Sequence, residues 1–258
     1  GAFSLKKVSA EARLLLIGIP VLLWTLIPVY HLFLFAISER DSATSGRLWP
    51  KNPTLQNFEI VFNQKHFYLD HFWVQMWNSL LIAVTVGVLT LFIATSAAFA
   101  ISRLKVRGGR TVMNLALFTY FIPAAFLAVP MYKAMGNYGL LNNQWALILA
   151  MVTIASPYCI WVLKQASDKL PFELDEAARM DGAGPMRFFK DILLPLSKTS
   201  IAALFVIQFI YGWNQYLWPL LATTSEDMYP VVVGIKMMVA GGDSQNEWNV
   251  VMATALLA

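Results

Sequence analysis

The chain has 258 residues, of which 58% are hydrophobic and only 13% are charged, whereas soluble domains carry about 25% charged residues. This composition is typical of an integral membrane protein. The modest net charge of +4, without a basic stripe interleaved with aromatic residues, argues against a nucleic-acid partner. The single cysteine, Cys159, excludes an intrachain disulfide and is expected to be a small buried apolar side chain.

The first apolar run covers residues 14–37 and holds one ionisable side chain, His31. This run is longer than the core of a signal peptide and no small-x-small cleavage site follows it, so it predicts a retained membrane span. Its two prolines are compatible with a span because neighbouring helices can satisfy the freed backbone groups. His31 is expected near the outer interface, with a proton relay as the alternative.

Residues 38–78 form a long connection of mixed charge that is predicted to lie outside the membrane. It ends in an aromatic cluster whose rings predict an interfacial belt, with a ligand cage as the alternative. The aromatic residues are Phe67, Tyr68, Phe72, Trp73 and Trp77.

Four further apolar runs predict spans, at residues 79–101, 111–132, 145–163 and 199–222. Residues 248–258 predict an incomplete sixth span, because so short a helix crosses only about half of a hydrocarbon core of roughly 30 Å. We therefore expect the end of the last helix, and the true start of the chain, to lie outside the sequence given. The fold class is an all-α integral membrane protein, with residues 1–258 forming a single transmembrane domain.

Orientation follows from the distribution of Lys and Arg. With the N-terminus in the cytoplasm, most of the 19 Lys and Arg residues fall in inner segments, whereas the reverse topology violates the positive-inside rule. The long charged segment at residues 167–196 is then cytoplasmic. It must lie outside the hydrocarbon in any case, since each charged side chain costs about 2.5–3.5 kcal/mol at the bilayer centre.

The segment at residues 167–196 predicts two short helices with a sharp break between them. Pro171 suits the first turn of the first helix, Gly182 suits its left-handed C-terminal cap, and Pro185 suits the start of the second helix. Pro195 is expected to end the second helix. Small apolar side chains at Leu174, Ala177 and Ala178 predict a shallow apolar face.

This segment resembles the EAA loop of the membrane subunits of bacterial ATP-binding-cassette (ABC) importers. The family pattern of Glu-Ala-Ala, a glycine and a terminal Leu-Pro is matched by Glu176, Ala177, Ala178, Gly182 and Pro195. The run Asp181-Gly182-Ala183 and Phe188 are similar to the carbohydrate-importer branch, of the maltose-permease type. The overall impression extends to a permease of an alginate importer, although no span carries a central Lys or Arg to attract an acidic sugar.

The resemblance implies a permease subunit of the type I ABC importer fold, in the bacterial inner membrane, that works by alternating access. The implied partners are two ATPase subunits, a second and different permease, and an extracytoplasmic solute-binding protein. ATP and Mg²⁺ would be bound by the ATPase partners, and no cofactor by this chain. The loop residues to which it assigns ATPase coupling are Glu173, Asp175, Glu176, Ala177, Ala178, Asp181, Gly182, Ala183, Phe188 and Pro195.

Within that set the expected roles differ. Glu176 is predicted to make the polar contact with the ATPase groove, and the alanines are predicted to allow close approach. Glu173 or Asp175 could instead serve ion pairs inside the loop. Phe188 and its neighbour Phe189 are expected to anchor the second helix against the membrane domain, with plain stability as the alternative.

Polar residues in the fifth predicted span favour a path for a hydroxyl-rich solute. Gln208, Tyr211 and Gln215 recur at i, i+3 and i+7, with Asn214 adjacent, and so would share one helical face. Amides and phenols hydrogen-bond to sugars. The alternative is hydrogen bonding between helices.

The outer loop at residues 223–247 is predicted to contact the solute-binding protein, with a passive hairpin as the alternative. The predicted contact residues are Gly241, Gly242, Asp243 and Asn246.

Other classes of function have little support in the sequence. There is no Gly-rich phosphate loop with a lysine, the histidines have no metal-ligand spacing, and no catalytic cluster is present, so the chain is not expected to be an enzyme. An importer permease for a non-sugar solute stays open as the alternative. A secondary transporter or channel is less favoured, because the spans carry no central charge.

Overall fold

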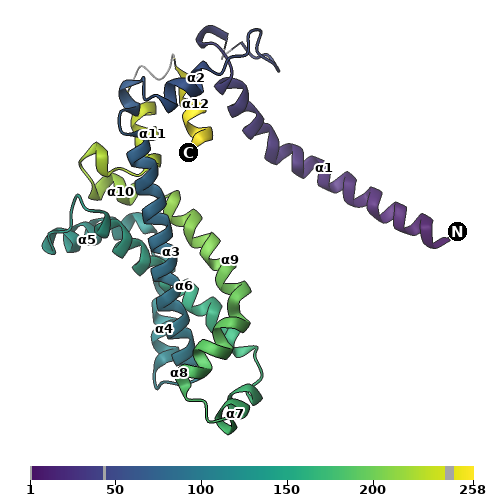
Figure 1. Cartoon of the computed structure of the whole chain (residues 1–258), viewed down its shortest axis with the longest axis vertical. Coiled ribbons are helices and arrows are strands. Elements are labelled where there is room, and N and C mark those ends of the chain that lie inside the picture. The colour runs from purple at the N-terminus through teal and green to yellow at the C-terminus, as the bar shows by residue number, and fades with distance from the viewer. Residues whose placement is uncertain (1, 43–44, 242–246) are drawn as a thin grey trace. The chain divides into compact units, whose positions relative to one another are not determined.

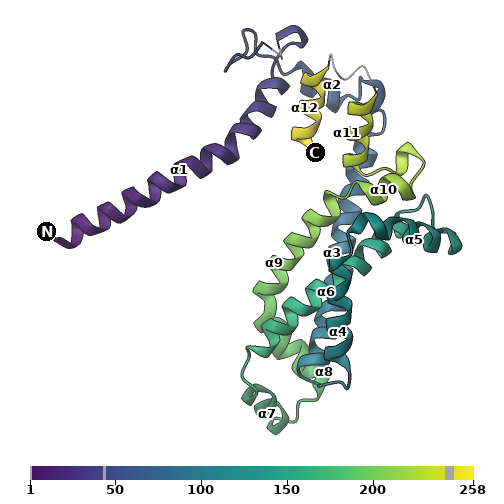
Figure 2. The same cartoon turned by 180° about the vertical axis from the view of Figure 1, so that it is seen from behind.

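The structure is a computed structural model that describes residues 2–42, 45–241 and 247–258, and this part of the chain is helical without a strand (Figures 1 and 2). The α-helices are α1 (Ala2–Ala36), α2 (Gln56–Phe62), α3 (Phe72–Ser102), α4 (Gly109–Phe118), α5 (Ala124–Asn137), α6 (Gln144–Asp168), α7 (Glu173–Met180), α8 (Pro185–Phe188), α9 (Leu194–Trp213), α10 (Leu217–Ala222), α11 (Val231–Ala240) and α12 (Trp248–Leu257). Short turns of other helix types are η1 (Arg40–Ser42), η2 (Phe67–Leu69), η3 (Thr119–Phe121), η4 (Phe189–Leu193) and η5 (Glu226–Met228).

The predicted all-α membrane fold is confirmed. Four stretches are long and apolar enough to cross a membrane, namely Glu11–Ala36, Phe67–Ser102, Gln144–Asp168 and Pro185–Trp213. Helices α4 and α5 make a fifth if the bent pair counts as one span. The predicted sixth span corresponds to α12, whose 10 residues reach only about 15 Å.

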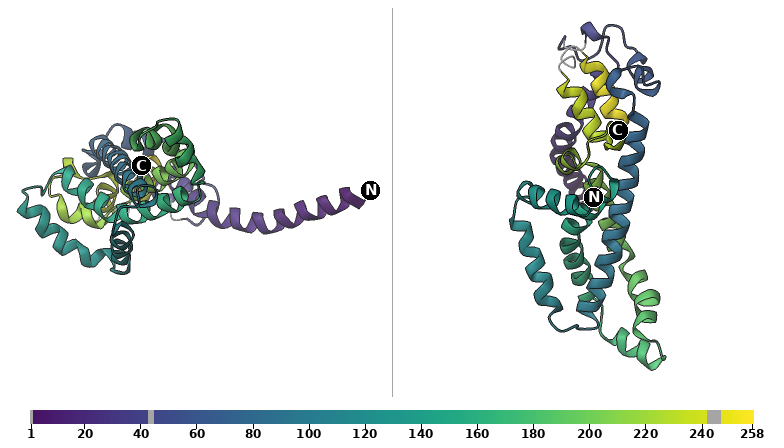
Figure 3. Two further views of the ribbon diagram at one scale, coloured as in Figure 1. Left: turned by 90° about the horizontal axis from the view of Figure 1, so that it is seen from below. Right: turned by 90° about the vertical axis from the view of Figure 1, so that its left-hand side faces the viewer.

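Two predicted spans are interrupted. The run at residues 111–132 is not one helix, because the chain bends by 110° between η3 and α5 (Figure 3, right). Pro123 follows Ile122, whose φ of −89° and ψ of 119° are extended, as expected for a residue before proline. The run at residues 199–222 divides likewise, since α9 ends at Trp213 and α10 begins at Leu217.

By their contacts the residues form two compact units, Gly1–Phe72 with Gly234–Ala258, and Trp73–Val233. In the first unit, buried asparagines join segments distant in sequence. The Asn57 side-chain amide donates to the carbonyls of Ala36 (2.7 Å) and Ser38 (2.9 Å), and the Asn249 amide donates to Asn57 Oδ1 (2.8 Å). These bonds connect the end of α1 with α2 and α12.

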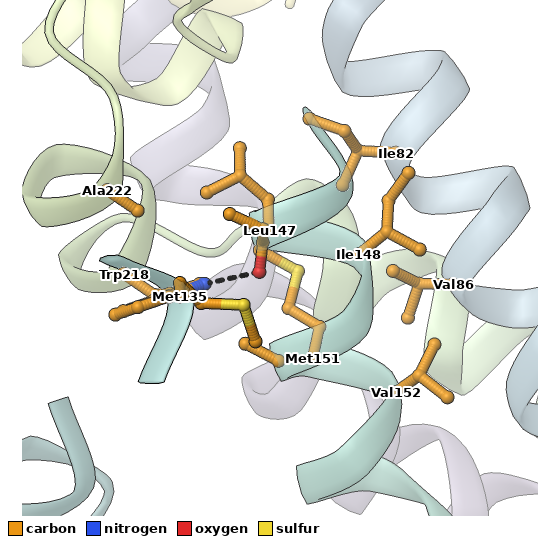
Figure 4. Packing of buried hydrophobic residues seen from close by; sticks show 11 residues of the cluster. Ile82, Val86, Met135, Leu147, Ile148, Met151, Val152, Trp218 and Ala222 are labelled. Carbon is orange, nitrogen blue, oxygen red and sulfur yellow. Dashed lines mark hydrogen bonds between the residues drawn. The ribbon is translucent and has the colours of Figure 1, made fainter. Parts of the chain in front are cut away.

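The second unit is built around α3, α6 and α9. Its largest apolar cluster joins α3, α5, α6 and α10 through Ile82, Val86, Met135, Leu147 and Trp218, among others (Figure 4). The Trp218 indole donates to the Ala146 carbonyl at 3.2 Å, so the buried ring has its polar group satisfied. The prediction of a single membrane domain stays a prediction.

Helices α3 and α9 cross at two glycines. A Cβ on Gly212 would lie 3.0 Å from Ala83 Cα, and a Cβ on Gly87 would lie 2.8 Å from the Phe205 ring. Small residues allow such close approach between membrane helices. Further along, Cys159 is fully buried with Leu91, Ala94, Ala98, Leu163 and Leu204, so its predicted burial is confirmed.

Candidate functional site

The charged loop predicted at residues 167–196 folds as two helices with a break at Gly182. The acidic first turn of α7, which holds Glu173, Asp175 and Glu176, suits the positive end of the helix dipole. Gly182 has φ of +72°, and the Ala183 N–H donates to the Ala178 carbonyl at 2.8 Å, as in a glycine-capped helix end. Pro185 occupies the first turn of α8.

Pro195 does not end the second helix, and that expectation was wrong. Helix α8 continues through η4, a π-helical turn, into α9, where Pro195 lies in the first turn. A proline inside a helix removes one hydrogen bond and crowds the carbonyl four residues earlier. The wider π turn accommodates that crowding. The loop is therefore continuous with the membrane helix α9.

The inner face of the loop packs against α3. Ala178, Phe188 and Leu193 are buried together with Phe99 of α3. The ring centroid of Phe99 lies 6.4 Å from that of Phe188 and 5.1 Å from that of Phe189. Both phenylalanines thus lie where they were expected to anchor the second helix.

A buried ion pair fastens the loop to two membrane helices. Arg103 follows α3, and its Nη1 lies 2.6 Å from Asp175 Oδ2, with the two side chains only 4% and 10% exposed. The same guanidinium donates to the carbonyls of Ser167 (2.5 Å) and Leu170 (2.9 Å) at the end of α6. Arg103 therefore joins α3, α6 and α7, and it satisfies one carbonyl of the last turn of α6, that of Ser167, and the carbonyl of Leu170 in the segment that follows.

Arg103 is a site residue that the sequence did not predict. In the sequence it is one more positive charge in an inner segment, and nothing in a single sequence pairs it with a carboxylate 72 positions away. An ion pair inside the loop was the alternative role for Asp175, and its carboxylate is instead paired with this arginine outside the loop.

The outer face of the loop is open. We define it as Glu173, Glu176, Ala177, Met180, Asp181, Gly182 and Met186, all of which are exposed. Met180 is 88% and Met186 is 72% exposed. Of the other predicted coupling residues, Asp175, Ala178 and Phe188 are buried inside the chain, Ala183 is half-buried and Pro195 is exposed. Contact of this set with an ATPase stays a prediction.

The residues predicted to line a solute path do not share one helical face. Gln208 is buried in α9, and its Oε1 has no hydrogen-bond partner. Tyr211 packs against the cluster of Figure 4. Asn214 caps the end of α9 and donates to the Ile210 carbonyl at 3.0 Å, whereas Gln215 follows the helix. The end of α9 therefore separates Gln215 from the other residues.

Of the four residues predicted to contact a binding protein, the structure describes Gly241. Gly242, Asp243 and Asn246 lie outside the described residues. Gly241 accepts a hydrogen bond from the Tyr68 hydroxyl at 3.4 Å. At the end of the same loop, Glu247 lies 2.6 Å from His66 Nε2 and 3.6 Å from Arg40 Nη1. The sequence did not predict these contacts because the partners are distant along the chain.

No cofactor centre is evident in the part of the chain that the structure describes. There, no three His, Cys, Asp or Glu side chains come together as a metal site would require.

Comparison with known proteins identifies a family whose model covers the α7–α8 loop. Residues 91–258 match the family model described as binding-protein-dependent transport system inner membrane component, a stretch that includes the whole loop. The chain is 38% identical over 247 residues to the sn-glycerol-3-phosphate transport system permease protein UgpE of Salmonella typhi, covering 95% of this chain and 86% of the relative. The UgpE protein of Escherichia coli O157:H7 matches to the same extent.

Two solved structures share the fold. A bacterial ABC transporter involved in the import of the acidic polysaccharide alginate gives a TM-score of 0.80 at 24% identity, covering 97% of this chain and 91% of that one. A bacterial alginate ABC transporter in complex with an alginate pentasaccharide-bound periplasmic protein gives 0.70 at 16% identity, covering 98% and 90%. At these identities the likeness concerns the fold alone.

Proposed function

Because the chain belongs to the family of binding-protein-dependent transport system inner membrane components, and is a non-catalytic permease subunit of an ABC importer, we propose that it couples solute passage to partner ATPases through its α7–α8 loop. The proposed assembly holds two ATPase subunits, a second and different permease and a periplasmic solute-binding protein. ATP and Mg²⁺ are bound by the ATPases. The whole chain acts as one permease domain with a cytoplasmic N-terminus.

The observation that carries this proposal is the mechanical connection of the loop. Its outer face is exposed for a partner, while its inner face is fixed to α3 by the phenylalanine cluster and to α6 by Arg103. Helix α8 also runs without interruption into α9. A displacement of the loop by ATPase closure is therefore transmitted to three membrane helices, which is what alternating access requires.

The test is co-purification of the ATPase with the chain from detergent. Glu176→Lys reverses an exposed charge on the outer face, and Gly182→Pro disrupts the cap of α7; both are expected to lose the ATPase. Glu226→Lys makes the same charge change at an exposed residue of η5 and is expected to retain it. Equal retention by all three variants, or no ATPase with wild type, would contradict coupling through this loop.

For the solute, we propose a carbohydrate, of oligosaccharide or polysaccharide size. The buried amide of Gln208, whose Oε1 lacks a partner, and the half-buried phenol of Tyr211 support a path that offers hydrogen bonds to hydroxyl groups. The proposed contacts of Asn214 and Gln215 lie at the end of α9, and those of Gly241, Gly242, Asp243 and Asn246 with the binding protein lie in the outer loop.

A second candidate solute is sn-glycerol-3-phosphate, favoured by the 38% identity to permeases of that name. One assay distinguishes the two candidate solutes: uptake by the importer reconstituted with its binding protein and ATP. Uptake of a labelled neutral oligosaccharide that excess glycerol-3-phosphate does not inhibit supports the carbohydrate. Uptake of labelled glycerol-3-phosphate, unaffected by sugars, supports the alternative.

A further inference from the structure

A basic cavity of about 690 Å³ opens where α3 and α6 end and α4 begins. Its volume falls within the range of about 300–1,000 Å³ that is usual for sites of small ligands. Five cationic side chains line it, together with one carboxylate, that of Asp168; the cations are Arg103, Lys105, Arg110, Lys164 and Lys169. The whole cavity belongs to the second compact unit.

Two of these five cations already have acidic partners. Arg103 is paired with Asp175 at 2.6 Å, and Lys164 with Asp168 at 2.5 Å. Lys105, Arg110 and Lys169 are exposed, and no carboxylate of the described residues comes within 4.0 Å of them. Three uncompensated positive charges around one cavity repel one another, and an anion would relieve this repulsion.

The Lys105 side chain is positioned at the cavity by a contact with an aromatic ring. Its Nζ lies 4.8 Å from the centroid of the Phe172 ring, a cation–π contact that keeps the ammonium beside the opening. This contact also places an aromatic face next to the cationic site.

The cavity lies at the depth where lipid headgroups are found. Ser102, Gly109 and Asp168 are termini of helices that are apolar enough to cross a membrane, so the space between them is at the membrane–water interface. From there α4 extends with three exposed apolar side chains at three-residue spacing: Val112 (66%), Leu115 (62%) and Phe118 (63%). An amphiphilic anion can place its headgroup in the cavity and its acyl chain along α4.

We propose that this cavity binds the phosphate headgroup of an anionic phospholipid, such as phosphatidylglycerol. Basic pockets between membrane helices are suited to such headgroups. A free phosphate shares the chemistry of the headgroup, but it would leave the apolar stripe of α4 unused. With the predicted topology, the lipid lies in the cytoplasmic leaflet, beside Arg103 and the base of α7.

The experiment uses the full chain purified in mild detergent, with bound phospholipid measured by native mass spectrometry during titration with phosphatidylglycerol. The double variant Arg110→Gln/Lys169→Gln removes two of the three free cations. Lys133→Gln/Lys198→Gln makes the same charge change at exposed lysines outside the cavity and serves as the matched control. We expect about 10- to 30-fold weaker binding in the cavity variant, and binding close to that of wild type in the control.

A second measurement needs no variant. In nanodiscs, adding phosphatidylglycerol to phosphatidylcholine should raise the Tm of the wild-type chain, whereas inorganic phosphate should not. Equal phospholipid binding by wild type and both variants would overturn the proposal. An unchanged Tm in phosphatidylglycerol, or stabilisation by inorganic phosphate alone, would also overturn it. If the cavity variant fails to elute as a folded species in gel filtration, the nanodisc comparison decides.

Discussion

Arg103 connects three helices through one guanidinium group. Its partners are a carboxylate on α7 and two backbone carbonyls, one in the last turn of α6 and one just after that helix. Removing one member of a buried ion pair leaves the other charge uncompensated in the low-dielectric interior, which lowers stability. Replacing both members by apolar residues can leave stability nearly unchanged. Single and double substitutions of this pair are therefore expected to differ in their effect on stability.

We expect Arg103→Ala to lower the free energy of unfolding by about 3–5 kcal/mol, because α7 loses its buried partner. The same variant is expected to uncouple ATP hydrolysis from solute transport. The measurements are the free energy of unfolding in detergent and the stimulation of ATPase activity by loaded binding protein. Arg187→Ala, which removes an exposed pair with Asp191 (3.5 Å), should change stability by no more than about 1 kcal/mol. The double variant Arg103→Met/Asp175→Leu should be less destabilised than Arg103→Ala. A double variant worse than the single one would contradict the pairing.

Gly182 and Gly184 offer a matched test of the cap of α7. A Cβ added at either glycine would meet no atom within 4 Å, yet Gly182 has φ of +72° and Gly184 has φ of −73°. We expect Gly182→Ala to cost about 1–2 kcal/mol, because an L-residue is strained in the left-handed region. Gly184→Ala should be neutral or slightly stabilising. Thermal unfolding measures the stability of each variant, and co-purification measures its binding to the ATPase. Equal losses of stability in Gly182→Ala and Gly184→Ala would exclude backbone strain at Gly182 as the cause.

At the level of elements, the crossing of α3 and α9 depends on the absence of a side chain at Gly212. The nearest atom to an added methyl would be the Ala83 Cα at 3.0 Å, which cannot rotate away as a side chain can. The two helices must therefore separate to admit any larger residue.

We expect Gly212→Ala to cost about 1–3 kcal/mol through overpacking. Gly18→Ala in α1, where nothing lies within 4 Å, should be neutral or slightly stabilising because alanine favours helix. The free energy of unfolding in detergent distinguishes them. A loss at Gly18 as large as that at Gly212 would show that the cost is not due to the crossing.

The helices that the sequence predicts best are those whose ends carry local signals. Gly182 and Pro185 mark the break between α7 and α8 correctly, because cap geometry depends on neighbouring residues. Pro123 lies in a run that predicts one uninterrupted span, although it separates η3 from α5 by a sharp bend. Pro195 predicts a helix end, although a π turn absorbs it. Whether a proline bends a helix, ends it or is accommodated within it depends on tertiary packing, which a single sequence does not reveal.

At the scale of the whole molecule, the described residues leave much apolar surface exposed. Most large side chains of α1 between residues 11 and 36 are exposed, with Leu14 at 70% and Trp24 at 84%. The family motif contains Glu176, Ala177 and Gly182 of the outer face of the α7–α8 loop, but not the exposed Met180 and Met186. Ala178 was expected at the partner surface but is buried with Phe99 and Phe188, a contact between residues distant along the chain that the sequence does not reveal.

The topology of the chain is a testable prediction at this scale. A reporter that fluoresces only in the cytoplasm should be active when inserted after Gly184 and inactive when inserted after Gly46, because the positive-inside bias places these sites on opposite sides. A fusion at the N-terminus should match the Gly184 insertion. Activity at Gly46 alone would show that the orientation is reversed.

The burial of the only cysteine has a practical consequence for watching the coupling loop move. Because Cys159 is enclosed among α3, α6 and α9 side chains, a thiol-reactive spectroscopic probe applied to the folded chain should leave it unlabelled. A cysteine introduced at Met180 or Met186, both strongly exposed, would then carry the only dye or spin label. The native chain is thus already suited to single-site distance measurements between the loop and a labelled ATPase through the transport cycle.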